Sequence, residues 1–222
     1  MAILEAIQAN LLSPAVLFFA LGLIAALKFG GHAPGIVLIY ESGTIGTRPD
    51  VLPLSIGDGE LAETASCVVP LPEIFSYYLQ AGRVDVGFLG AAQIDRYGNL
   101  NSTVIGDYDA PATRLPGAGG ATEIAAHARS TFVMLKATRR SFVERLDFRT
   151  SAGFLEGSDS RELAGATGAG PVSVITDFGV LAPDPQSREL QLSALFPGAT
   201  VEEARAHLAE AVALYLESAD PA

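Results

Sequence analysis

Glu41 is the residue in this sequence whose position most directly suggests chemistry. It follows the apolar run Ile36–Tyr40 and precedes Ser42 and Gly43. The run is short and rich in branched side chains, a pattern that predicts a buried strand. Ligands of open α/β sheets bind where strands end, so Glu41 could take part in catalysis. The same pattern also fits a strand that simply ends at its first solvated residue.

A glycine-rich stretch, RLPGAGGATEIAAHA at residues 114–128, is a second candidate. Gly117, Gly119 and Gly120 permit backbone conformations closed to other residues and a close approach by a ligand. Thr122 then begins a predicted helix, so free N–H groups would point outward toward an anion or an oxyanion. Many loops contain three glycines, and this stretch alone does not define a site.

Two further blocks are conspicuous, GAAQIDRYGNLNSTVIGDY at residues 90–108 and TSAGF at residues 150–154. The first carries four hydrogen-bonding residues, Gln93, Asp95, Asn99 and Asn101. They could bind a substrate. They could equally stabilise turns, because Asn and Asp side chains bond readily to nearby backbone.

Composition excludes several classes of function. The net charge of −11 argues against nucleic-acid binding, which needs a basic patch. No pair among His32, His127 and His207 has helical metal-ligand spacing, so we expect no metal site of the common kinds. Neither a phosphate-binding P-loop nor a G-x-S-x-G elbow is present. Cys67 is the single cysteine, which fits a reducing, cytoplasmic location without an intrachain disulfide.

The elements that must position these residues alternate along the chain. Strands separated by helices and glycine-rich loops predict one α/β domain over residues 1–222, with an open, mainly parallel or mixed sheet and helices on both faces. We expect Ile36–Tyr40 and Val84–Leu89 to be neighbours in its core. The predicted strands are 36–40, 84–89, 131–135, 172–176 and 190–195, and the predicted helices are 71–80, 122–128 and the amphipathic segment 201–217.

The start of the chain is unusually apolar. Within residues 11–27, Ser13 is the only polar side chain, and a span of 17 residues lies at the lower limit for crossing a membrane. A signal peptide is disfavoured because Glu5, and no Lys or Arg, precedes the segment. We therefore interpret residues 1–30 as an atypical hydrophobic segment whose helix, 14–28, is buried against the sheet or a partner. The alternative is a membrane anchor.

Taken together, the motifs resemble the β subunit of class I coenzyme A transferases, of the glutaconate CoA-transferase type. The resemblance runs from about His32 to His207 and rests on HAPGIVLIYESG, GAAQIDRYGNLNSTVIGDY, RLPGAGGA and TSAGF in the family's order. It implies that Glu41 is the nucleophile and that the loop containing Gly117, Gly119 and Gly120 supplies N–H groups near the thioester. Ser42, Gly43, Gln93 and Asn99 are further candidates for the substrate site.

The resemblance also implies a reaction and its partners. Coenzyme A would move between an acyl-CoA and a carboxylic acid through a glutamyl-CoA thioester, with coenzyme A as a substrate and no permanently bound cofactor. The site would lie at an interface with an α-type subunit. Substrate side chains would lie near Arg48, Phe75 and Tyr77 or on that subunit. Alternatives are an acyl-CoA hydrolase on the same scaffold, a non-catalytic protein that keeps the fold, and a membrane-anchored protein.

The two ends of the chain depart from the family. Family members usually begin with a further helix and strand, whereas residues 11–25 resemble the first membrane segment of sodium-dependent bicarbonate transporters. Residues 203–217, EARAHLAEAVALYLE, resemble the closing helix of a HicB-type antitoxin. We therefore interpret the chain as a mosaic, with a transferase middle and borrowed end helices.

Overall fold

The computed structural model describes residues 35–50, 53, 55–138 and 140–196. None of the helices in these ranges combines the length and the apolar character that a membrane span requires. The predicted helices 14–28 and 201–217 lie outside the described residues, so both stay predictions.

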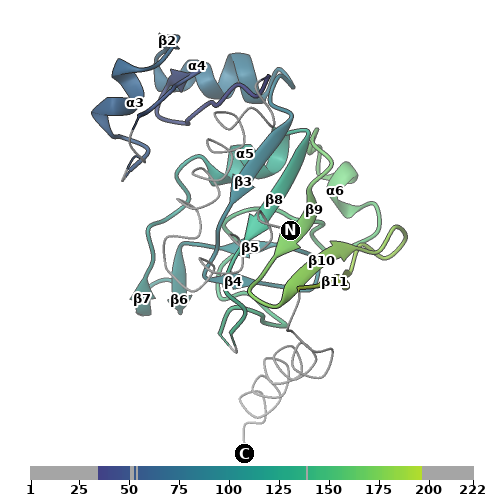
Figure 1. The fold of residues 1–222 in the computed structure, drawn as a ribbon. Helices are drawn as coiled ribbons and strands as arrows, with labels where there is room; N and C mark the ends of the chain where they lie inside the picture. Colours follow the sequence, from purple (N-terminus) through teal and green to yellow (C-terminus); the bar gives the residue numbers. More distant parts are fainter. Residues whose placement is uncertain (1–34, 51–52, 54, 139, 197–222) are drawn as a thin grey trace, which may run out of the picture.

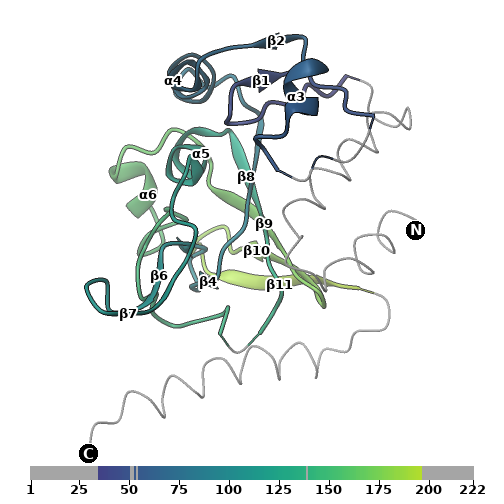
Figure 2. The same cartoon turned by 90° about the vertical axis from the view of Figure 1, so that its left-hand side faces the viewer.

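A mixed sheet forms the centre of the described structure, with strand order β11-β10-β9-β8-β3 (Figure 1). The neighbours β3, β8 and β9 run parallel, whereas β10 is antiparallel to both β9 and β11. Figure 2 shows α5 and α6 on the same side of this sheet. The strands are Val86–Leu89 (β3), Ser130–Met134 (β8), Pro171–Ile175 (β9), Gly179–Pro183 (β10) and Leu190–Leu195 (β11), and the helices are Ala121–His127 (α5) and Ser160–Leu163 (α6).

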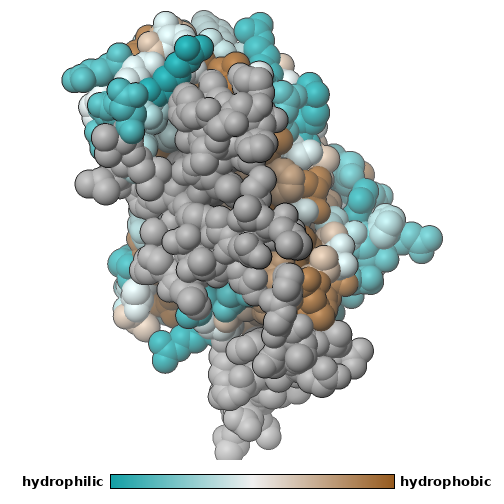
Figure 3. Space-filling model, viewed as in Figure 1, coloured by the Kyte–Doolittle hydropathy of each residue, from teal (hydrophilic) through white to brown (hydrophobic). Residues whose placement is uncertain are grey.

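Alternating side chains divide the apolar residues of the sheet between its two faces. Leu89, Val133 and Val174 join the main core, into which Ala125 of α5 also packs. Their neighbours on the other face, Phe88 and Ile175 among them, pack around Met134 and Phe196. Figure 3 shows apolar surface gathered over β9 and β10.

Four of the five predicted strands are confirmed within one or two residues, whereas the sequence patterns do not predict β10. Gly179 opens this strand and Pro183 closes it, and both residue types are unfavourable inside strands and typical of turns. The turn between β10 and β11 lies within residues 184–189. The Asp184 side chain accepts hydrogen bonds from the backbone N–H groups of Gln186 and Ser187 at 2.9 and 2.8 Å.

A smaller layer lies across one end of the sheet (Figures 1 and 2). It contains Thr44–Ile45 (β1), Gly59–Glu63 (α3), Cys67–Val68 (β2), Leu71–Glu73 (α4) and the π-helical turn Ile74–Leu79 (η1). The last two elements form the helix predicted over 71–80. Its second half is wider than an α-helix, as the bond from Gln80 N to Phe75 O at 2.8 Å illustrates.

The prediction that Ile36–Tyr40 is a strand beside Val84–Leu89 is wrong. Ile39 instead makes an isolated antiparallel bridge to Ile45, and β8 is the described neighbour of β3. The chain turns back at Glu41–Gly43, so Leu38 O and Tyr40 N bond to Gly46 N and Thr44 O at 2.7 and 3.0 Å. Local pairing thus satisfies this backbone, while Leu38 and Tyr40 pack with Leu61 in a separate small core.

Short hairpins and a long loop complete the described part. The paired strands are Gln93–Ile94 (β4) with Leu100–Asn101 (β5), and Val104–Gly106 (β6) with Pro111–Arg114 (β7). Asn99, which is 1% exposed, connects the first hairpin to the TSAGF block. Its Oδ1 accepts from the N–H groups of Gly153 and Leu155 at 2.9 and 3.0 Å, and its Nδ2 donates to Asp95 and to Leu155 O, both at 2.8 Å.

We expect Asn99→Ala to lower the free energy of unfolding by about 3 kcal/mol, because it leaves several buried polar groups without partners. Urea denaturation of the purified chain measures the loss. The matched control is Gln186→Ala, which removes the side chain of an exposed turn residue. Equal stability of the two variants would contradict a stabilising role for the Asn99 network.

Candidate active site

Glu41 lies in the tight turn that ends the segment 36–40 rather than at the end of a central strand. Gly43 makes this turn possible, since its φ is +115° and a side chain there would collide with the carbonyl of Val69. Its N–H donates to Tyr40 O at 3.0 Å, and the Ser42 hydroxyl donates to Ile56 O at 2.7 Å. The bonds of Ser42 and Gly43 therefore hold the turn and fix the direction in which Glu41 points.

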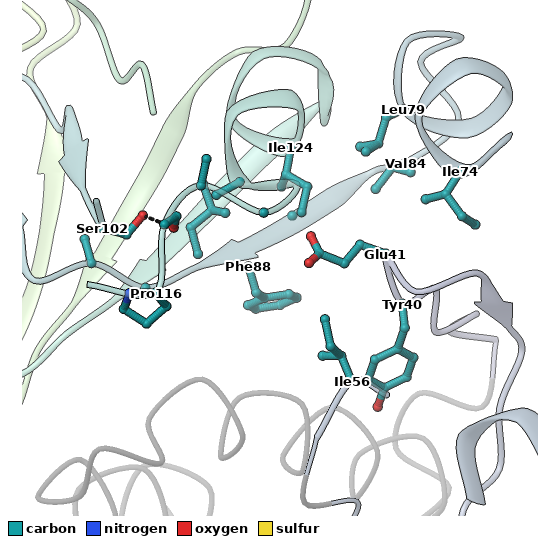
Figure 4. A pocket seen from close by; sticks show the side chains of 18 of the residues that line it. Tyr40, Glu41, Ile56, Ile74, Leu79, Val84, Phe88, Ser102, Pro116 and Ile124 are labelled. Atoms are coloured by element: carbon teal, nitrogen blue, oxygen red, sulfur yellow. Dashed lines mark hydrogen bonds between the residues drawn. The ribbon is translucent and has the colours of Figure 1, made fainter. Parts of the chain in front are cut away.

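The glycine-rich loop reaches the same place from the main body of the molecule. Leu115 N donates to Thr103 O at 3.0 Å, and Gly117 N donates to Ser102 O at 2.8 Å. In return, the Ser102 hydroxyl donates to Gly117 O at 2.9 Å (Figure 4). This reciprocal pair anchors the loop just before Gly119, Gly120 and α5.

Turn and loop meet at one short contact. Gly120 N donates to the Glu41 carboxylate at Oε2 over 3.1 Å, and the other oxygen, Oε1, lies against Gly119. A side chain on Gly120 would collide both with Oε2 and with the ring of Phe75 from η1. Glycine is thus required at position 120 because two groups approach its backbone closely.

A cavity of about 490 Å³ opens beside this contact. Glu41 points into it between Phe88 and Ile124 (Figure 4). The wall is largely apolar, and Glu41 is the charged residue among the described lining. The loop lines it with Gly117 and Gly119, and strand β3 lines it along its length.

The structure brings together some of the predicted site residues and separates others. Glu41, Gly117, Gly119 and Gly120 converge as the sequence predicted. The Gly117 N–H is already bonded to Ser102 O, whereas the N–H of Gly120 donates to the carboxylate. Ser42 and Gly43 shape the turn that carries Glu41.

Gln93 and Asn99 do not reach the cavity. Gln93 is buried, accepts from Asn101 Nδ2 at 2.7 Å and donates to Asp147 at 2.9 Å. Asn99 is bonded to Asp95 and to the TSAGF loop, as described above. These bonds use the side-chain amides for folding, which is the turn and loop role that the sequence left open as an alternative.

The residues proposed to lie near the substrate are also spread out. Phe75 lies against Gly120, whereas Tyr77 is 59% exposed and Arg48 is exposed beside Thr64. Sequence reasoning missed Ser102 and Arg161. Ser102 lies inside the block at residues 90–108 and could have been noticed there, but Arg161 carries no local signal of its burial.

No group of His, Cys, Asp and Glu side chains suited to a metal ion occurs among the described residues. The groups that meet at the contact are a carboxylate and backbone N–H donors. A carboxylate can act as nucleophile, and N–H groups can stabilise an oxyanion.

Comparison with known proteins identifies the class. The family model described as coenzyme A transferase matches residues 15–206. The chain is 56% identical to the B subunit of 3-oxoadipate CoA-transferase from Pseudomonas knackmussii over 192 residues, which cover 85% of this chain and 74% of the relative. This chain therefore belongs to the coenzyme A transferase family.

The particular kind of subunit follows from the named relatives. The B subunit of glutaconate CoA-transferase from Acidaminococcus fermentans is 37% identical over 201 residues, covering 86% of this chain and 75% of the relative. The crystal structure of glutaconate coenzyme A-transferase from the same organism superimposes with a TM-score of 0.77 and 32% identity, covering 90% of this chain and 82% of that one. The chain is a β-type subunit of this family, and both the family and the predicted α/β fold with an open, mixed sheet are confirmed.

We expect Gly120→Ala to displace the Glu41 carboxylate, because the added methyl group occupies the position of Oε2. The overpacking should also lower the free energy of unfolding by about 1–3 kcal/mol. A crystal structure of the variant and urea denaturation measure the two effects. Gly59→Ala is the matched control, since nothing lies within 4 Å of the added atom there. An unmoved Glu41 in the Gly120 variant would contradict the tight contact.

Proposed function

We propose that this chain carries the nucleophile, Glu41, of a coenzyme A-transferase that works with an α-type subunit. The observation that carries the proposal is the 3.1 Å contact between Gly120 N and Glu41 Oε2 at the wall of the cavity. Membership in the family supplies the reaction class, and the contact supplies a nucleophile with an adjacent N–H donor.

The reaction begins when a Glu41 oxygen attacks the thioester carbon of an acyl-CoA. The C–S bond breaks, coenzyme A leaves as a thiolate, and a mixed anhydride joins the acyl group to Glu41. The thiolate then attacks the Glu41 side-chain carbonyl carbon and releases the acyl group as a carboxylate. The glutamyl-CoA thioester that remains reacts with an acceptor carboxylate by the reverse steps, which gives ping-pong kinetics.

The contact with Gly120 fits the second step in particular. We take Oε1 as the oxygen that attacks, so Oε2 remains as the carbonyl oxygen of the anhydride, and negative charge develops on Oε2 when the thiolate adds to the Glu41 carbonyl carbon. Gly120 N–H already lies within hydrogen-bond distance of that atom, so it needs little rearrangement to stabilise the charge. Loss of one such donor typically costs about 3 kcal/mol of transition-state stabilisation.

The apolar wall suits the intermediates. A mixed anhydride and a thioester both hydrolyse in water, so a site that excludes water protects them. An acyl-CoA hydrolase on the same scaffold is the second candidate, in which water takes the place of the acceptor acid. An assay with and without an added carboxylic acid separates the two, because a transferase releases little free coenzyme A when no acceptor acid is present.

We propose 3-oxoadipate as the first acceptor to test, because the relative named for that acid is 56% identical. We also propose that the complex is heteromeric and cytoplasmic. Two relatives are named as B subunits, which supports a partner, and the single cysteine fits a reducing compartment.

We expect Glu41→Gln to abolish the covalent adduct while leaving the fold intact, because it removes a charge and almost no volume. The complex is incubated with 3-oxoadipyl-CoA, which is the donor in the reverse direction of the reaction. Mass spectrometry locates the coenzyme A adduct at Glu41 and, after borohydride reduction has removed coenzyme A, the alcohol that replaces the thioester. The matched control is Glu63→Gln, which changes an exposed glutamate of α3. Unchanged transfer by Glu41→Gln would rule out the nucleophile role.

We further expect the purified chain alone to transfer coenzyme A very slowly. Mixing it with the α-type subunit of a 3-oxoadipate CoA-transferase should raise the rate, because the family's reaction is proposed to take place at the interface between subunits. Steady-state assays across a titration of the α-type subunit measure the gain. Rapid turnover by the chain alone would refute the need for a partner.

A further inference from the structure

Arg161 of α6 is a buried cation that the proposed reaction does not use. Arg161 is 1% exposed, although arginine is rarely buried fully. Burial lowers the pKa of its guanidinium, and the neighbouring charge of Glu162 opposes this effect. Among the described residues its hydrogen bonds go to backbone carbonyls, which makes its surroundings unusual for a charge.

These carbonyls belong to segments that are far apart in the sequence. Nη1 donates to Ala152 O and Gly153 O of the TSAGF block at 3.1 and 2.8 Å. Nη2 donates to Ala125 O and Ala126 O in the last turn of α5 at 2.5 and 3.3 Å, and Nε donates to Gly168 O at 3.0 Å. The planar fork of arginine is therefore matched to carbonyls in fixed positions, which neither a lysine nor an apolar residue can reproduce.

The slot around the guanidinium is built to fit it. A Cβ on Gly170 would lie 3.1 Å from Arg161 Nε, and a side chain on Gly168 would collide with the carbonyl of Ala128. Gly153 is equally constrained, since an added side chain would collide with the backbone of Tyr97 and Gly98. Close packing thus holds Gly153 against residues 97–98, Gly168 against the residues that end α5, and Gly170 against Arg161 itself.

The same block also holds the beginning of α5. The Thr122 hydroxyl donates to Thr150 O at 2.9 Å. Thr150 Oγ1 in turn accepts from Ser102 N at 2.9 Å, and Ser102 anchors the loop at Gly117. Residues 150–153 are thus connected to the end of α5 through Arg161, and to its start through Thr122 and Ser102.

We propose that Arg161 and Thr122 are positioning residues for the reaction at Glu41. Together they fix α5 at both ends against residues 150–153, and the N–H of Gly120, which directly precedes the helix, is thereby held on Glu41 Oε2. This inference rests on the proposed role of Glu41. It assigns the TSAGF block, which lies outside the cavity lining, the task of supporting the catalytic contact.

The Thr122 variants give the sharpest test, because Thr122 is exposed and its replacement leaves the core intact. Thr122→Val removes the hydroxyl with nearly the same shape, and Thr122→Ser keeps it. In the complex with the α-type subunit, kcat for transfer of coenzyme A from 3-oxoadipyl-CoA to an added carboxylic acid should fall about tenfold in Thr122→Val, since small misplacements of reacting groups are costly. The KM for the thioester should change little, and Thr122→Ser should retain most of the wild-type kcat.

Thr113→Val is the matched control, because Thr113 is an exposed threonine on β7, away from α5. Activity is expressed per active site, counted by the amount of Glu41 adduct formed at completion. A role in stability alone would lower the folded fraction but leave kcat per active site unchanged. Equal kcat per site in Thr122→Val, Thr122→Ser and Thr113→Val would overturn the proposal.

The second test is chemical rescue at Arg161. Arg161→Ala leaves a slot of guanidinium shape, so added guanidinium at non-denaturing concentrations should raise kcat per site about tenfold, whereas methylammonium should not. Rescue by neither cation, in a variant shown to be folded by circular dichroism, would overturn the role of Arg161. If Arg161→Ala does not fold, the Thr122 series decides.

The wild-type complex separates this inference from the proposed function. If wild-type Glu41 acquires no coenzyme A adduct, the proposed function fails. If the adduct forms and the variants behave like wild type, the nucleophile stands and the positioning role is wrong.

Discussion

One hydrogen bond, from Gly120 N to the carboxylate of Glu41, is the constraint on which the functional arrangement depends. It joins residues 79 positions apart in the sequence, and it places a nucleophile beside a donor that can stabilise an oxyanion. An N–H group is directional and has a fixed place in the backbone. The position of this donor relative to Glu41 therefore depends on the elements that hold the two backbone segments. Much of the described structure holds either the turn that carries Glu41 or the loop that carries Gly120.

Sequence patterns predicted β3, β8, β9 and β11 of the main sheet but not β10, because each of the four is a short segment of apolar or alternating apolar residues between turn residues. They failed for Ile36–Tyr40 because composition does not show which neighbour a strand chooses. Tyr40 and Leu38 are as apolar as a core strand requires, yet Gly43 allows the chain to turn back at once, and local pairing with Thr44–Gly46 satisfies the backbone. The convergence of Glu41 with the glycine-rich loop was nevertheless correct, because it followed from the resemblance to the family and did not depend on how the segment before Glu41 pairs.

The polar residues show a similar division. The sequence marked Gln93, Asn99 and Asn101 as hydrogen-bonding residues, and they do bond, but to one another and to buried backbone groups rather than at the cavity. Side-chain type predicts the capacity to bond, whereas the partner depends on the tertiary fold. Arg161 is the extreme case, because a short S-R-E-L helix is typical of a solvated surface and only the assembled carbonyls reveal a buried guanidinium.

The contact also lies between two separately packed parts of the molecule. Glu41 belongs to the small layer with its own core at Leu38, Tyr40 and Leu61, and Gly120 belongs to the main body. This hydrogen bond alone would hold the two parts together only weakly, since a single bond contributes about 1 kcal/mol net.

Contacts between η1 and α5 supply the missing restraint. The ring of Phe75 packs on Gly120, and Gln80 Nε2 donates to Glu123 Oε2 at 3.1 Å. Phe75 and Glu41 therefore approach the same glycine from the small layer. The absence of a side chain at position 120 lets the layers come close enough for the N–H to reach the carboxylate, so the residue that provides the donor also sets the distance between the layers.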